Sequence, residues 1–275
     1  MTQRSFRPVR LPMYDWPEVA SETQELEVAL TDEICSALAI APSALEPWDP
    51  EISLYDLWTY PALLFAQTCG YPLTHKLAGK VHLLGAPHYR ATGCKGAKYC
   101  SQIVVAANSP FQSLTDLKGA RAVFNGPDSQ SGMNAFRDTI APMSDGVGFF
   151  ESVVESGGHL ASMDAVAKGR ADVAAIDGVC WALAEQEKPG LANQLRALAQ
   201  TAQVPGLPFI TSMHLGAETH AEISAAVSRV LSNPQTEKSR KRLRICGFSK
   251  LSLADYQVIL DMEADARARN YSVLA

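Results

Sequence analysis

The chain has 275 residues, 47% of them hydrophobic and 19% charged, with a formal net charge of −5 and a pI near 5.7. This composition describes a globular protein long enough for two lobes, and it argues against disorder and against a nucleic-acid-binding surface. The sequence contains no run of about 18 apolar residues, so we expect no membrane-spanning helix and no direct membrane insertion.

In chain order, the hydrophobic pattern predicts strands at 6–11, 81–86, 102–107, 123–124, 151–155, 173–176 and 195–200. It predicts helices at 17–38, 131–141, 160–168 and 179–187, and mostly helix from residue 218 onward. Residues 63–67 fit either a strand or the end of a buried helix. Alternation of this kind predicts an α/β fold with mainly parallel sheets, and the length suits two lobes with a cleft between them.

Neither a metal centre nor a leader is evident from the residues. The six cysteines are scattered, and the spacing of Cys94 and Cys100 matches no common zinc pattern, so we interpret most of them as core residues or free thiols. Whether Cys94 and Cys100 pair stays open. No apolar leader segment follows Met1, which is typical of a cytoplasmic protein or of one whose leader has been removed.

The most informative segment is Asn-Gly-Pro-Asp-Ser-Gln-Ser-Gly-Met-Asn-Ala-Phe-Arg at 125–137, which lies between a strand-like run and a helix-compatible run. A helix N-terminus has unpaired backbone N–H groups and a partial positive charge. The hydroxyls of Ser129 and Ser131 beside Gly132 would make such a terminus a pocket for an oxyanion such as phosphate. The simpler interpretation is that Ser129 or Ser131 only caps the helix.

Several short motifs occur in a fixed order over about one hundred residues. They are Tyr-x-Ser-x-Ile-Val-Val (99–105), Ser-Leu-x-Asp-Leu-Lys-Gly (113–119), Ser-x-Ser-Gly-x-Asn (129–134), Ser-Gly-Gly-His (156–159), Val-Ala-Lys-Gly-Arg-Ala-Asp-Val-Ala-Ala-Ile-Asp (166–177) and Pro-Gly-Leu-Pro (205–208). This ordered set resembles the phosphate/phosphonate solute-binding proteins of ABC transporters, the PhnD-like branch of the type II periplasmic binding protein fold. Weaker similarity extends to 11–18 and 66–72.

The resemblance implies an α/β fold of two lobes, each a mixed, mostly parallel sheet flanked by helices. Lobe 1 would comprise residues 1–100 and 206–275, and lobe 2 would comprise residues 101–205. The lobes would close on a small ligand held between them, without a cofactor or a metal and without catalysis. An ABC transporter permease would be a partner. The family is normally exported, so the resemblance implies a periplasmic location, whereas a native start at Met1 would imply a cytoplasmic one.

The resemblance also implies a set of ligand-binding residues. Ser129, Ser131, Gly132 and Asn134 match the family's anion loop and would donate hydrogen bonds to phosphoryl oxygens. Asp177 follows an apolar strand, and its carboxylate would select a protonated oxyanion or an aminoalkyl phosphonate. The alternative is that Asp177 caps the following helix.

Four further residues complete the expected site. The phenol of Tyr14, the hydroxyl of Thr68 and the phenol of Tyr99 are candidate donors, and His159 follows a glycine pair that would form an anion-binding nest. Each has a structural alternative: Tyr14 and Tyr99 as packing residues, and His159 as a structural hydrogen-bonding residue. Cys69 is interpreted as non-catalytic, because a nucleophilic cysteine needs a nearby base.

We therefore predict a non-enzymatic binding protein for phosphate, phosphite or a phosphonate. Three alternatives stay open. One is an enzyme built on the same fold that uses Cys69 or Asp177. Another is an intracellular ligand sensor, and the third is a binder of another small solute such as a sulfonate.

Overall fold

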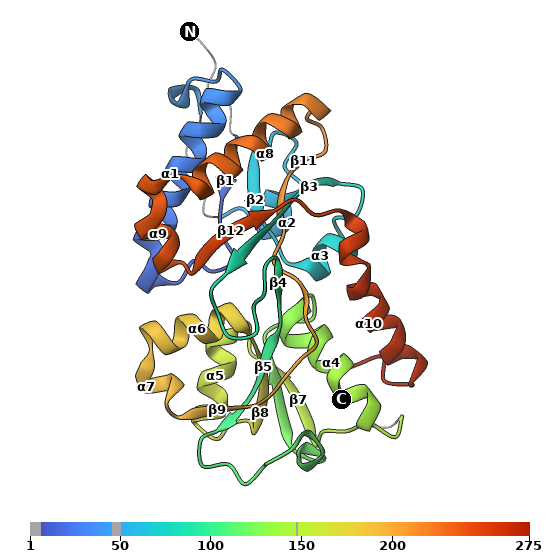
Figure 1. Ribbon diagram of the computed structural model, residues 1–275. Helices are drawn as coiled ribbons and strands as arrows, with labels where there is room; N and C mark the ends of the chain where they lie inside the picture. Colours follow the sequence, from blue (N-terminus) through green and yellow to red (C-terminus); the bar gives the residue numbers. More distant parts are fainter. Residues whose placement is uncertain (1–6, 46–50, 147) are drawn as a thin grey trace. The chain divides into compact units, whose positions relative to one another are not determined.

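The computed structural model describes residues 7–45, 51–146 and 148–275 (Figure 1). It divides into two compact units. The first unit runs to Tyr89 and resumes over Gly206–Leu253, and the second comprises Arg90–Pro205 and Ala254–Ala275. Residues 90–100 and 254–275, which we expected in lobe 1, therefore belong to the second unit. The C-terminal segment is part of the unit that carries the serine-rich loop.

The first unit contains a five-stranded mixed sheet with the strand order β1-β2-β11-β3-β12. Its strands are β1 (Val9–Arg10), β2 (Phe65–Gln67), β3 (Val81–Tyr89), β11 (Phe209–Ser212) and β12 (Ile245–Ser249). β1 and β2 are parallel, and the other neighbours are antiparallel. The strands β2 and β11 are buried along their whole length, so the core of this unit is centred on them.

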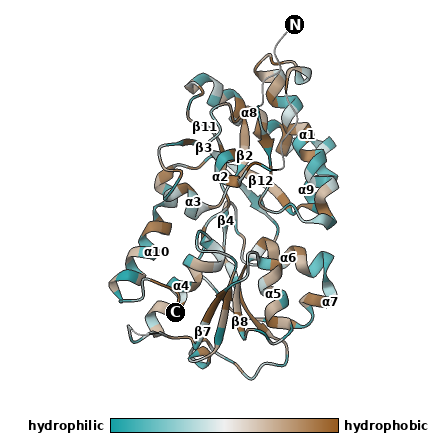
Figure 2. Ribbon diagram, turned by 180° about the vertical axis from the view of Figure 1, so that it is seen from behind, coloured by the Kyte–Doolittle hydropathy of each residue, from teal (hydrophilic) through white to brown (hydrophobic). Residues whose placement is uncertain are grey.

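Helices of the first unit are α1 (Ala20–Ala37), α2 (Leu54–Trp58), α3 (Gly70–Thr74), α8 (Ala217–Ser232) and α9 (Glu237–Arg242), with 3₁₀ turns at Pro17–Val19, Pro42–Ala44 and Pro234–Thr236. Helix α1 buries Leu26, Leu30 and Ile34 at helical spacing and packs against α8. The charged helix α9 is coloured as hydrophilic in Figure 2. The pattern at 17–38 thus predicted this helical segment to within a residue or two.

The second unit contains a five-stranded mixed sheet with the order β7-β6-β8-β5-β9. Its strands are β5 (Ser101–Ala106), β6 (Arg121–Phe124), β7 (Ser152–Glu155), β8 (Val173–Asp177) and β9 (Leu195–Gln200), and the separate antiparallel pair is β4 (Lys98–Tyr99) and β10 (Val204–Pro205). β7, β6 and β8 are parallel, whereas β5 is antiparallel to β8 and β9. Figure 2 shows hydrophobic residues dominating the strands near β7 and β8.

Helices of the second unit are α4 (Ala135–Ile140), α5 (His159–Ala167), α6 (Gly178–Glu187), α7 (Pro189–Ala192) and α10 (Gln257–Ala268). Shorter elements are a π-helical turn at Gln130–Asn134 and 3₁₀ turns at Leu114–Leu117, Ala141–Met143 and Leu253–Tyr256. Phe136 and Ile140 of α4 pack with Val173 of β8 and with Tyr271 and Leu274 near the C-terminus. The last residues of the chain are thus part of this unit's core.

Two features differ from the predicted elements. Strand β12 interrupts the region after residue 218 that was expected to be mostly helical, and part of the first predicted strand lies outside the described residues. More of the strand pairs are antiparallel than the alternation of strands and helices predicts. In the first sheet β11 and β12 pair antiparallel with their neighbours, and in the second sheet β5 pairs antiparallel with β8 and β9. No helix in the described part of the chain is long and apolar enough to cross a membrane.

Candidate functional site

Three loops meet at one edge of the second unit's sheet. β6, β7 and β8 are parallel, so their carboxyl ends lie at the same edge, where ligands bind in open α/β sheets. The loop after β6 leads into the helical segment 130–140, the loop after β7 leads into α5, and the loop after β8 leads into α6. This edge therefore combines three helix N-termini, each with a partial positive charge.

The residues Ser129, Ser131, Gly132 and His159 form what we call the serine cradle. Ser129 Oγ accepts a hydrogen bond of 2.9 Å from the backbone N–H of Gly132 and lies 3.5 Å from Ser131 Oγ. Ser131 Oγ lies 2.9 Å from Nε2 of His159. Both serines are buried. Ser129 thus caps the helical segment, as the simpler interpretation expected. Ser131 instead contacts His159, the first residue of α5.

A neighbouring strand holds the backbone of the cradle in place. Ser101, the first residue of β5, donates its hydroxyl to the carbonyl of Ser131 at 2.9 Å. The backbone N–H of Ser101 in turn donates to Thr201 Oγ1 at 2.9 Å. Ser101 was not predicted as a site residue. The Tyr-x-Ser motif that contains it was the only signal that could have pointed to it.

Gly132 is required by a close approach of Asn125. A Cβ atom at position 132 would lie 1.9 Å from Asn125 Oδ1 and 3.1 Å from Cε1 of His159. Asn125 Oδ1 is buried and has no hydrogen-bond partner among the described residues. The glycine therefore lets the asparagine and histidine side chains approach the backbone of the cradle.

His159 is neutral at physiological pH. Burial lowers its pKa to about 4, and the nearby carbonyl of Ala175 opposes this effect only in part. Nδ1 of His159 makes no well-aligned hydrogen bond among the described residues. A neutral imidazole has one donor nitrogen and one acceptor nitrogen, so the Ser131 contact works in either direction.

Asp177 is 2% exposed and caps helix α6. Its Oδ1 accepts hydrogen bonds from the backbone N–H groups of Val179, at 2.7 Å, and Cys180, at 3.2 Å. Asp177 lies opposite Ser101 in the β5–β8 ladder, which places it beside the residue that supports the cradle. The capping alternative is therefore realised, and the selection of a protonated ligand by Asp177 stays a prediction.

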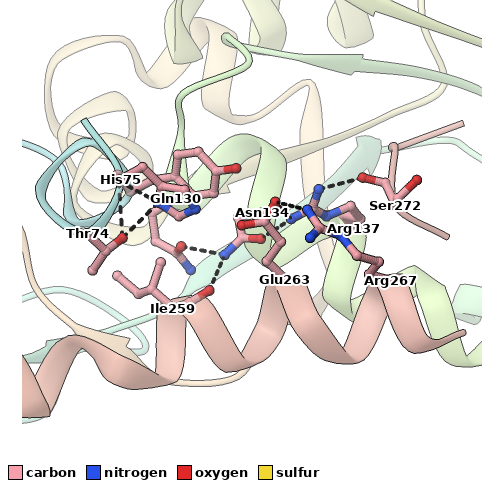
Figure 3. Close-up of polar contacts among 10 residues, drawn as sticks. Thr74, His75, Gln130, Asn134, Arg137, Ile259, Glu263, Arg267 and Ser272 are labelled. Atoms are coloured by element: carbon pink, nitrogen blue, oxygen red, sulfur yellow. Dashed lines mark hydrogen bonds and ion pairs between the residues drawn. The ribbon is translucent and has the colours of Figure 1, made fainter.

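Asn134 lies beside Ile259 of α10 (Figure 3). Its side chain is fully buried, and its Nδ2 donates to Gln130 Oε1 at 2.8 Å and to the carbonyl of Ile259 at 3.1 Å. Its Oδ1 accepts from Arg137 at 2.6 Å. The structure thus uses Asn134 to attach the helical segment 130–140 to α10.

The first unit gathers other predicted residues around β2. The ring of Tyr14 packs edge-on against Tyr89, with centroids 5.3 Å apart. Tyr89 OH accepts a hydrogen bond of 3.0 Å from Gln67 Nε2. Tyr89, the last residue of β3, was not among the predicted site residues. Tyr99, in contrast, is buried in β4 of the second unit, opposite Val204.

Thr68 follows β2 and is 0% exposed. Its backbone N–H donates to the carbonyl of Pro208 at 3.0 Å, but its hydroxyl has no hydrogen-bond partner among the described residues. Cys69 is also buried, at the start of α3. A buried hydroxyl without a partner is unusual, and a bound ligand would satisfy it.

Within the described residues, no group of three or more His, Cys, Asp or Glu side chains is arranged to hold a metal ion. None of the six cysteines in these residues forms a disulfide, so no disulfide joins Cys94 to Cys100.

Comparison with known proteins relates the whole arrangement to one family. Residues 63–256 match the family model described as "ABC transporter, phosphonate, periplasmic substrate-binding protein". No curated protein matches the sequence.

Solved structures share the fold at low sequence identity. A binding protein component of an ABC phosphonate transporter from Pseudomonas aeruginosa (PA3383) is 15% identical with a TM-score of 0.75, covering 97% of this chain and 88% of that one. PhnD1 from Prochlorococcus marinus, in complex with methylphosphonate, is 14% identical with a TM-score of 0.72, covering 96% and 98%. XAC2383 from Xanthomonas citri, bound to ATP, is 16% identical with a TM-score of 0.69, covering 97% and 98%.

Proposed function

The chain belongs to the phosphonate family of ABC transporter substrate-binding proteins, and we propose that its serine cradle binds a small phosphorus oxyanion: phosphate, phosphite or a phosphonate. The observation that carries the proposal is the contact of 2.9 Å between Ser131 Oγ and His159 Nε2. This contact brings together two loops that follow different strands. It joins a hydroxyl, an imidazole and the N-termini of two helical segments at one edge of the sheet.

The chemistry of the cradle suits an oxyanion. Backbone N–H groups at helix N-termini and serine hydroxyls donate hydrogen bonds, and hydrogen bonds to an ionised acceptor are stronger than neutral ones. Within the described part of the chain, no Lys or Arg side chain hydrogen-bonds to Ser129, Ser131 or His159. The anion would therefore be held by oriented dipoles rather than by direct ion pairs.

Other residues enter the proposal as predicted contacts. The unpartnered hydroxyl of Thr68 supports a role as a donor, and Tyr14 lies in the same unit, in the loop after the neighbouring strand β1. Tyr99, Asn134 and Asp177 stay predicted contacts, although the hydrogen bonds of Asn134 and the capping by Asp177 favour structural roles for these two.

We propose a binding role without turnover, with a transporter permease as the protein partner. The family supports both points, because its members are described as substrate-binding components of ABC transporters. Incubation with methylphosphonate followed by mass spectrometry tests the first point. Unchanged ligand supports a binder, and a cleaved or modified product would identify an enzyme.

Titration calorimetry with phosphate, phosphite, methylphosphonate, 2-aminoethylphosphonate and sulfate tests the binding function. We expect at least one phosphorus oxyanion to bind more tightly than sulfate. Binding of sulfate alone, or of none of the five, would contradict the proposal.

A further inference from the structure

A buried cation lies on the helical segment that carries the serine cradle. Arg137 is only 4% exposed, although its guanidinium group is a cation. It follows Ser131 by six positions, which corresponds to roughly 9 Å along a helix. The same segment thus carries the cradle at its N-terminus and Arg137 less than two turns further along.

The hydrogen bonds of Arg137 are made to neutral groups (Figure 3). Its Nη1 donates to the carbonyl of Ser272 at 2.6 Å, and its Nη2 donates to Asn134 Oδ1 at 2.6 Å. Its Nε is buried and has no partner among the described residues. These contacts position the guanidinium but do not neutralise its charge.

The carboxylates around Arg137 compensate the charge only in part. Glu263 Oε1 is 3.9 Å from Nη2 of Arg137, and the same oxygen is closer to Arg267, at 3.2 Å. Burial and the Asp265 carboxylate raise the pKa of Asp138 despite the opposing effect of Arg137. Arg137 is the most buried of these arginines, and it shares its nearest carboxylate, at 3.9 Å, with Arg267.

We propose that Arg137 strengthens ligand binding electrostatically: from the same helical segment it supplies the positive charge that the serine cradle lacks. This inference rests on the proposed function. A charge inside the protein is weakly screened, so a buried cation attracts an anion bound at the start of the same helical segment at longer range than an exposed cation would. A buried cation that shares its nearest carboxylate is unfavourable in the free protein, and a bound anion would offset part of that cost.

Three variants separate charge from mere structure. Arg137→Gln removes the charge and keeps a side-chain amide, and we expect it to weaken methylphosphonate binding about tenfold. Arg137→Lys keeps the charge, and we expect its affinity for methylphosphonate to remain within about threefold of that of the unsubstituted protein. Glu263→Gln removes the partly compensating carboxylate, so binding should become about threefold tighter.

The last variant is decisive, because a purely structural role predicts the opposite. Loss of the Glu263 ion pairs would loosen the contact between α10 and the helical segment 130–140, and binding would then weaken. Calorimetry gives the affinities, and circular dichroism shows whether each variant is folded. If Arg137→Gln does not fold, Glu263→Gln still decides the question.

The possible results distinguish failure of the proposed function from failure of the inference about Arg137. If the unchanged protein binds no phosphorus oxyanion, the proposed function fails and this inference fails with it. If the unchanged protein binds but Arg137→Gln binds equally well, or Glu263→Gln binds no more tightly, only this inference is overturned.

Discussion

Ser131 and His159 lie 28 positions apart in the sequence, yet Ser131 Oγ is 2.9 Å from His159 Nε2. Each side chain stands at the start of a helical segment that follows a parallel strand. Since burial keeps the imidazole neutral, the pair can reorient its protons without adding charge.

Removing the Ser131 hydroxyl should weaken binding directly. We expect Ser131→Ala to reduce the affinity for the preferred oxyanion by about 1–3 kcal/mol, because a charged acceptor loses a donor. Titration calorimetry measures the effect. Ser232→Ala, on helix α8 of the first unit, removes an exposed hydroxyl bonded only to its own helix and should leave affinity unchanged. Equal affinity of both variants would remove Ser131 from the site.

Adding a methyl group at Gly132 should distort the cradle. Its Cβ would lie 1.9 Å from Asn125 Oδ1, so we expect Gly132→Ala to cost about 1–3 kcal/mol of unfolding free energy and to weaken binding. Gly190→Ala is the matched control, because its Cβ would meet nothing within 4 Å. Urea unfolding measures the loss. The double variant Asn125→Ala/Gly132→Ala should recover part of the stability, and no recovery would argue against this clash.

Acid should destabilise the protein through His159. Its pKa is about 4 in the folded chain against 6.5 as its ordinary value, so the unfolded state binds more protons between these limits. Stability therefore falls as the pH is lowered from about 6.5 toward 4, by about 3 kcal/mol at most. Urea unfolding of the unchanged protein and of His159→Gln across this range isolates the contribution. Parallel curves would show that His159 does not contribute.

Capping by Asp177 should contribute to the unfolding free energy of the protein. Asp177→Ala removes the acceptor for two backbone N–H groups at the start of α6, so we expect a loss of about 1–2 kcal/mol. Asp177→Asn keeps one acceptor oxygen and should lose less than half of that. Thermal unfolding measures both variants. If Asn is as damaging as Ala, the carboxylate charge matters more than the cap.

The hydroxyls of Thr68 and Thr211 offer a matched comparison in one unit. Both residues are fully buried, but Thr211 Oγ1 donates to the carbonyl of Leu63 at 3.0 Å, whereas Thr68 Oγ1 has no partner among the described residues. Thr211→Val should cost about 1–2 kcal/mol of stability, and Thr68→Val should cost little or nothing. If Thr68 contacts the ligand, Thr68→Val should weaken binding about fivefold to tenfold. Unchanged affinity would leave its hydroxyl without a function in binding.

Local sequence patterns predicted most of the elements that position the cradle. The apolar runs before Asn125 and Asp177 form buried strands, and the serine and glycine residues after the first run form a capped helix start. These features could be predicted because they depend on neighbours within a few residues. The family motifs are also short local patterns, and their fixed order pointed to the α/β fold of two units.

Long-range contacts decided the rest. The side of the helical segment that faces α10 depends on Ile259 and Ser272, more than 120 residues away, so these contacts could not be predicted locally. The ligand contact of Asn134 stays a prediction. The contact between Ser131 and His159, the orphan hydroxyl of Thr68 and the buried charge of Arg137 likewise depend on which strands pair. Composition and spacing thus established the types of groups that can bind an anion, but only the packing of distant segments determined which of them face one another. The physical reason is that burial and desolvation, which give these groups their energies, arise from the packed chain as a whole.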